Sequence, residues 1–142
     1  MTCKLSLATL AEAAKTAAIP DAGLKASVTA PATAGSLDIS TAGLANTQWA
    51  ILLTITNLTA ASGTPRARIT MEDTTDNFTT PLTIACWNIQ GPITSDAPLS
   101  LSVERENIPS LRAGVTSAKL RCNLIALEGT TPTISYNANL LP

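Results

Sequence analysis

Two pairs of charged residues, each with a single residue between its members, are the first candidates for chemistry. Glu104 and Glu106 offer the two carboxyl groups that general acid–base catalysis uses. Arg66 and Arg68 offer a phosphate or carboxylate site, because guanidinium groups bind these anions through paired hydrogen bonds. Residues two apart share one face of a strand, so both pairs also fit a solvated surface or salt bridges across a subunit contact.

The chain of 142 residues contains no histidine. This excludes Ser-His-Asp and Cys-His catalysis, histidine metal ligands and histidine proton switches. Cys3, Cys86 and Cys122 form no metal-binding spacing, and an odd number does not make a disulfide framework. Cys86 and Cys122 fall in predicted strands, where they form either a bridge or two small buried apolar side chains. We therefore expect no enzyme, no cofactor and no metal.

The segment 72–77 is acidic and rich in oxygen donors, which is the chemistry that calcium requires. It lacks the fixed spacing of an EF-hand loop. Asp76 and Asn77 are also typical turn residues, because their side chains bond to the nearby backbone. The segment is therefore interpreted as a hairpin turn, with calcium binding as the alternative.

The two tryptophans are the candidates for stacking on sugar rings. Trp49 begins a strand in which every second residue is apolar, so it is predicted to cover the core. Trp87 shares its predicted face with Thr83, Ala85 and Ile89. Both tryptophans are interpreted as core or protein-interface residues, and sugar binding stays open as the alternative.

Composition narrows the class of protein further. Hydrophobic residues make up 45% of the chain and charged residues only 13%, with a net charge of −1. Nucleic-acid binding is not expected, because it calls for a surplus of basic residues. No apolar run is long enough to span a membrane, and Glu12 and Lys15 interrupt the one stretch that resembles a signal peptide.

Residues 1–23 are predicted to form an N-terminal arm with a short helix over 5–18, which ends before Pro20. The apolar stripe of this helix is narrow and consists mostly of alanine. Such a helix is not stable in isolation, so it must lie on this domain or on a neighbour. We expect Leu5, Leu7 and Leu10 to anchor it.

Residues 24–142 are predicted to form one all-β domain. Apolar and polar residues alternate with a period of two, and Gly-, Pro- and Asp-containing turns separate the segments. The predicted strands cover 24–30, 37–40, 49–56, 66–72, 82–89, 99–104, 119–126 and 133–140. Segment 82–89 is apolar on both faces, which predicts a central strand. The expected architecture is an antiparallel β-sandwich, Ig-like or jelly-roll, of about eight strands.

The low charge content predicts self-association. A monomeric β-protein usually protects its exposed strands with charge, and with lysine in particular. This chain has four lysines, and Thr, Ser and Asn fill the exposed strand positions. Such a surface loses little on burial against another protein, because few charges must be desolvated.

Several stretches of the chain form a series of strands and turns: WAILLTITNL (49–58), SGTP (62–65) and ARITMEDTTDNF (67–78), then SLR (110–112), KLRC (119–122) and GTTPTISY (129–136). The resemblance that this series carries is to capsid decoration, or cement, proteins of tailed bacteriophages. It spans about residues 45–140 and consists of strands and turns. It implies a β-sandwich whose dimers or trimers sit on an icosahedral shell and clamp neighbouring capsomers.

We therefore expect a non-enzymatic virion protein, made in the host cytoplasm, that binds the outside of the capsid. The expected partner is the major capsid protein, and the expected assembly is a homotrimer or another homo-oligomer. The residues assigned to partner contacts are Leu5, Leu7, Leu10, Trp87, Arg66 and Arg68. The alternatives are a tail, fibre or head–tail joining protein, and a carbohydrate-binding or adhesin module.

Overall fold

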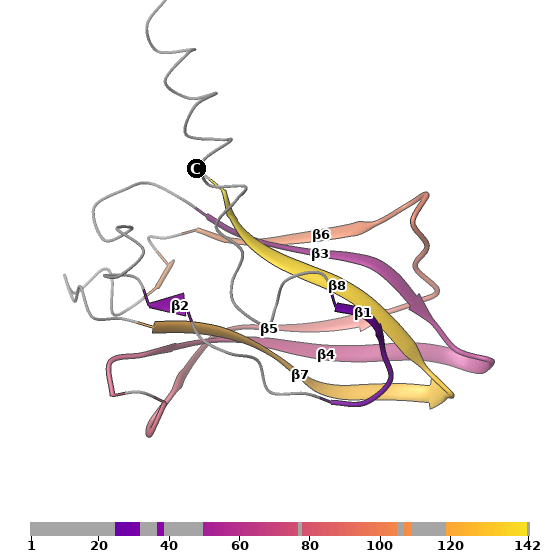
Figure 1. Cartoon of the computed structure of the whole chain (residues 1–142), viewed down its shortest axis with the longest axis horizontal. Helices are drawn as coiled ribbons and strands as arrows, with labels where there is room; N and C mark the ends of the chain where they lie inside the picture. Colours follow the sequence, from indigo (N-terminus) through magenta and orange to yellow (C-terminus); the bar gives the residue numbers. More distant parts are fainter. Residues whose placement is uncertain are drawn as a thin grey trace, which may run out of the picture.

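The protein consists of two antiparallel β-sheets stacked as layers in the computed structural model (Figure 1). The structure describes residues 25–31, 37–38, 50–76, 78–104, 107–108 and 119–141. The prediction of an all-β chain with two packed antiparallel sheets is confirmed over these residues. The predicted helix over 5–18 lies outside them. Among the described residues there is no helix of the length and hydropathy needed to cross a membrane.

The first sheet has the strand order β1-β8-β3-β6, and the second has the order β2-β7-β4-β5. The strands are β1 (Lys25–Val28), β2 (Leu37–Asp38), β3 (Ala50–Thr59), β4 (Ser62–Thr74), β5 (Leu82–Gln90), β6 (Leu99–Glu104), β7 (Lys119–Thr130) and β8 (Thr133–Leu141). Six of these strands are long, three in each sheet. β1 and β2 are short edge strands of four and two residues, so the sandwich has six long strands where about eight were expected.

The strand pairs are nested along the sequence. β1 pairs with β8, β2 with β7, β3 with β6 and β4 with β5, and the four pairs alternate between the two sheets. Two further pairs, β3 with β8 and β4 with β7, join these into four-stranded sheets. Among the described strands, only β4 and β5 are neighbours both in sequence and in a sheet.

The core lies between the layers and follows from the period-two pattern. On β3, Ile51, Leu53 and Ile55 are fully buried and alternate with half-buried residues. On β4, Ile69 and Met71 face them from the other sheet and are also fully buried. Aliphatic side chains therefore fill most of the interior, and Tyr136 is the one fully buried aromatic side chain among the described residues.

β5 differs from its prediction. It lies at the edge of the second sheet and, of the strands that the structure describes, pairs with β4 alone, so the expectation of a central strand is wrong. A β-bulge explains why β5 has apolar residues on both faces. The register shifts between Met71 and Glu72 of β4, which places an extra residue, Ile84, on β5. Ile84 packs against the core, whereas Leu82 is 50% exposed.

Candidate functional site

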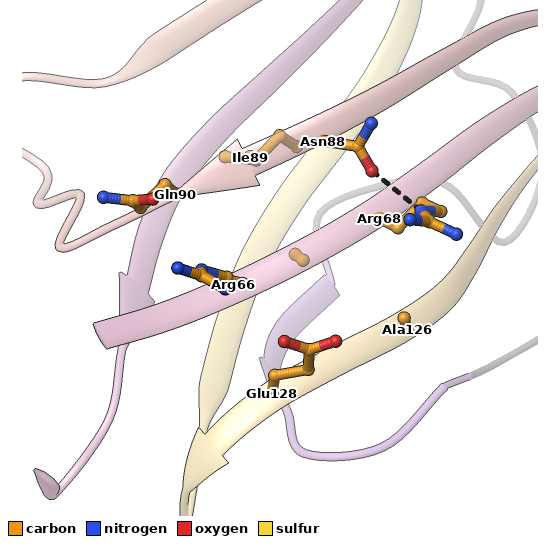
Figure 2. A pocket seen from close by; sticks show the side chains of 8 residues that line it. Arg66, Arg68, Asn88, Ile89, Gln90, Ala126 and Glu128 are labelled. Atoms are coloured by element: carbon orange, nitrogen blue, oxygen red, sulfur yellow. Dashed lines mark hydrogen bonds between the residues drawn. The ribbon is translucent and has the colours of Figure 1, made fainter. Parts of the chain in front are cut away.

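A polar groove on the outer face of the second sheet is the candidate site that the structure forms from predicted residues (Figure 2). Arg66 and Arg68 lie side by side on β4, and side chains from both neighbouring strands flank them. The groove has a volume of about 380 Å³. Its lining residues are Arg66, Ala67, Arg68, Asn88, Ile89, Gln90, Ala126 and Glu128.

Strand alternation and register position these side chains. Because Ala67 and Ile69 are buried in the core, Arg66 and Arg68 must face outward. Arg68 lies between Asn88 of β5 and Ala126 of β7. The small Ala126 side chain leaves room beside the Arg68 guanidinium. A register shift between β4 and β7 begins at this point, between Arg68 and Ile69.

The groove carries an excess of positive charge. The Nε of Arg68 donates a hydrogen bond to Oδ1 of Asn88 at 2.7 Å, which fixes the orientation of this guanidinium. The Arg66 side chain forms no ion pair or hydrogen bond with any other described residue, although Glu128 is its direct cross-strand neighbour. The predicted arginine pair therefore offers two guanidinium groups against one carboxylate.

The outer face of the first sheet has the opposite character. Over β3, β6 and β8, its side chains are half-buried or exposed and nearly all carry hydroxyl, amide or methyl groups. They are Ala50, Leu52, Thr54, Thr56, Asn57 and Thr59 of β3, Ser100, Ser102 and Glu104 of β6, and Thr133, Ser135, Asn137 and Asn139 of β8. Glu104, at the end of β6, is the one charged residue in this set. We call this set the uncharged face.

Hydrogen bonds within the uncharged face hold one end of it in place. Thr59 and Thr133 share a hydrogen bond of 2.9 Å between their hydroxyl oxygens. The side-chain nitrogen Nδ2 of Asn57 donates a hydrogen bond to the same Thr133 hydroxyl at 3.2 Å. These bonds link β3 to β8, so this part of the face is a preorganised surface rather than a row of independent side chains.

The acidic segment forms a turn, and Asp76 is its centre. The Asp76 carboxylate accepts hydrogen bonds from the Thr74 hydroxyl at 2.7 Å and from the Thr80 backbone nitrogen at 3.2 Å. The Thr80 hydroxyl donates to it as well. Led by the Thr80 side chain, these bonds lower the pKa of Asp76 to about 2. Over the described ranges no group of three His, Cys, Asp or Glu side chains could hold a metal ion.

Trp87 lies on the inner side of β5. It pairs with the buried Ile69 in the register, packs against the core and is half-buried because β5 is an edge strand. The register shift at Ile84 also separates it from Thr83, which pairs with Glu72 and is exposed. The prediction that Trp87 and Thr83 lie on the same face of β5 is therefore wrong. The prediction that Trp87 shares its face with Ala85 and Ile89 is confirmed.

The two described cysteines are free and lie on opposite sides of the second sheet. Cys122 is fully buried in the core, and burial raises the pKa of its thiol to about 12. Cys86 is exposed and pairs with Thr70, next to the outward-facing arginines. The bridge between them, one of the two interpretations left open, does not form. The other interpretation, two buried apolar side chains, is confirmed for Cys122 and wrong for Cys86.

Several predicted residues lie outside the described part of the chain. These are Leu5, Leu7, Leu10, Trp49 and Glu106, so the assigned arm contacts and the glutamate pair stay predictions. Glu104 is exposed. Sequence reasoning missed Asn88, Gln90 and Glu128 as the neighbours of the arginines in the groove. The alternation of Asn88 and Gln90 with the apolar residues of β5 could have predicted that both face outward. Their position beside β4 could not be predicted from the sequence.

Comparisons with known proteins give no further guide to the site. No protein-family model matches the chain, no curated protein matches it, and no solved structure matches it.

Proposed function

We propose that this chain is a non-enzymatic structural protein of a phage virion, which binds the outside of the capsid and stabilises contacts between capsomers. The observation that carries the proposal is the separation of charge between the two outer faces. Arg66, Arg68, Glu72, Arg121 and Glu128 lie on the second sheet. Over β3, β6 and β8, the uncharged face of the first sheet carries one charged residue, Glu104.

This separation suits a protein that attaches by one side. A face of Thr, Ser and Asn side chains can be buried against another protein at little cost, because the only charge that would lose its hydration is that of Glu104, at the end of β6. The charged second sheet then faces solvent and keeps the assembled particle dispersed. We place the major capsid protein on the uncharged face.

The nested strand pairing supports a jelly roll in preference to an Ig-like sandwich. In an Ig-like sandwich, the first two strands pair within one sheet. Here β1 and β2 lie in different sheets, and each pairs with a strand near the other end of the chain. Jelly rolls occur in viral capsid domains and also in lectins, so the fold is compatible with the proposal without deciding it.

We further propose that the chain acts as a homotrimer or another closed oligomer and that the arm anchored by Leu5, Leu7 and Leu10 contributes to attachment. Several copies bound together gain affinity from effective concentration, so each individual contact can be weak. Light scattering at micromolar concentration is expected to give a trimer mass. Deletion of residues 2–18 is expected to weaken attachment to the shell.

Site-specific photo-crosslinking in assembled particles tests the proposal. A benzophenone amino acid replaces Ser102, on the uncharged face, or Thr83, which is exposed on the second sheet beside Glu72. Position 102 is expected to crosslink to the major capsid protein, and position 83 is the matched control. Crosslinks from position 102 to a tail, fibre or joining protein would support that alternative location instead. Capsid crosslinks from position 83 alone would overturn the proposed orientation.

A further inference from the structure

The arginine groove is built asymmetrically. Counted across β5, β4 and β7, its two rows are Asn88–Arg68–Ala126 and Gln90–Arg66–Glu128. In the first row the guanidinium group has no carboxylate as a cross-strand neighbour. In the second row Glu128 offsets the charge of Arg66. A ligand that fits both rows carries one negative charge at Arg68 and hydroxyl groups at Glu128.

The guanidinium group of Arg68 is preorganised to bind a carboxylate. Its Nε is already occupied by the 2.7 Å hydrogen bond to Asn88, so the two terminal nitrogens remain for a ligand. These nitrogens match the two oxygens of a carboxylate in a paired arrangement. The fixed orientation also reduces the entropy lost on binding. Ala126, beside Arg68 in Figure 2, has only a methyl side chain, which leaves room for the ligand at this end of the groove.

The size and lining of the groove point to a small polar ligand. Its volume of about 380 Å³ lies at the lower end of the range for small-molecule sites. Amide, guanidinium and carboxylate groups line it, and these are suited to hydrogen bonds with sugar hydroxyls. We propose that the groove binds a carboxylated sugar, as one acidic unit next to a neutral unit in a polysaccharide.

An acidic peptide fits the groove less well. In an extended peptide, side chains on one face repeat every two residues, about 7 Å apart. A first carboxylate at Arg68 would therefore place the second one in the row of Glu128, where two like charges repel. A sugar places hydroxyl groups there, and Glu128 accepts hydrogen bonds from them. The groove lies on the sheet opposite the uncharged face, so this proposal does not depend on capsid attachment.

Nuclear magnetic resonance titration of the full chain tests the proposal with a matched pair of ligands. Cellobiouronic acid carries one carboxylate, and cellobiose is the same disaccharide with a hydroxymethyl group in its place. Cellobiouronic acid is expected to shift the side-chain amide signals of Asn88 and Gln90, whereas cellobiose binds at least tenfold more weakly, because a charge-assisted hydrogen bond is lost.

Three variants test whether cellobiouronic acid binds in the arginine groove. Arg68→Gln is expected to weaken cellobiouronic acid binding about tenfold or more. Lys119→Gln removes one positive charge from the other end of the same sheet face and is expected to change binding less than about twofold, because solvent screens distant charges. Glu128→Gln is expected to weaken binding too, since it replaces a charged hydrogen-bond acceptor. Unfolding curves for each variant confirm that the fold is retained.

Two further ligands distinguish the alternatives. Inorganic phosphate that binds as tightly as cellobiouronic acid would show a simple anion site and overturn the sugar assignment. A Glu-Ser-Glu-Ser peptide that binds more tightly, and gains affinity in Glu128→Gln, would show a peptide site. Equal binding of cellobiose, no binding of cellobiouronic acid at millimolar concentration, or unchanged binding in Arg68→Gln would each overturn the proposal.

Discussion

Arg121 and Glu72 form a cross-strand ion pair, with Nε of the arginine 2.5 Å from Oε2 of the glutamate. Both side chains are largely buried, at 21% and 14% exposure. The same guanidinium group covers the ring of Phe78, with its central carbon 4.2 Å from the ring centre. Arg121 thereby joins β7, β4 and the turn that contains Asp76 into one unit.

A double-mutant cycle of Arg121→Ala and Glu72→Gln measures this pair. We expect a coupling free energy of about 1 kcal/mol from urea unfolding, because the pair is shielded from water and has close geometry. Arg66→Ala and Glu128→Gln provide the control cycle, since these cross-strand neighbours form no ion pair. Their coupling is expected near zero, and equal values in both cycles would contradict the structural assignment.

Asp76 gives the turn a pH dependence. Its pKa is lowered from 3.8 to about 2 by hydrogen bonds to the carboxylate, chiefly from the Thr80 side chain. A lowered pKa in the folded state stabilises the turn above the unfolded value of 3.8, and this stabilisation is lost as the pH falls through about 2. The Thr80 amide signal in nuclear magnetic resonance spectra is expected to follow this titration.

Asp76→Asn is the control for the pH experiment, because it removes the titrating group and keeps the size of the side chain. In this variant the Thr80 amide signal should stay constant from pH 5 to about pH 2. A midpoint near 4 in the wild-type protein would mean that the hydrogen bonds to Asp76 do not form in solution.

Two isoleucines of the second sheet allow the stability effect of a core side chain to be compared with that of a surface side chain. Ile69 is fully buried, whereas Ile125 is 46% exposed. Ile69→Ala is expected to reduce the free energy of unfolding by about 3 kcal/mol, through lost burial and a new cavity. Ile125→Ala is expected to change it by less than about 0.5 kcal/mol. Similar values from thermal or urea unfolding would place β7 or β4 in a different register.

Cysteine labelling tests the two faces of the same sheet. In a Cys3→Ser background, iodoacetamide at pH 8 is expected to modify Cys86 in the native protein, because that thiol is exposed. Cys122 should react only after unfolding, since it is buried and its pKa is raised to about 12. Mass spectrometry of peptides distinguishes the two sites, and early labelling of Cys122 would contradict its inward position.

The period-two pattern was sufficient to predict the strands and their inner residues. Ile69 and Met71 alternate with Arg68 and Thr70, and this alone placed the arginines outside. The pattern failed at Ile84, because an extra residue in one strand shifts every later side chain and no residue type marks the shift. A strand with apolar residues on both faces therefore looked central although it lies at an edge.

The candidate groove could be predicted only in part, for a related reason. Arg66 and Arg68 are two residues apart on one strand, so local spacing was enough to find them. Asn88 and Glu128 come from strands that flank β4 on either side, and strand order depends on contacts between distant parts of the chain. Local spacing carries no information about such contacts.

The nested pairing of the strands also constrains how this chain reaches its fold. Apart from the hairpin of β4 and β5, every pair within a sheet joins segments that are separated by at least one other strand. The entropy of closing such long loops must be overcome before their contacts form, which makes folding slow, on the order of milliseconds to seconds. During synthesis, β1 has no partner in its sheet, and β3 has only β6, until β8 has been made. The first sheet is therefore incomplete until the whole stretch from β1 to β8 has left the ribosome.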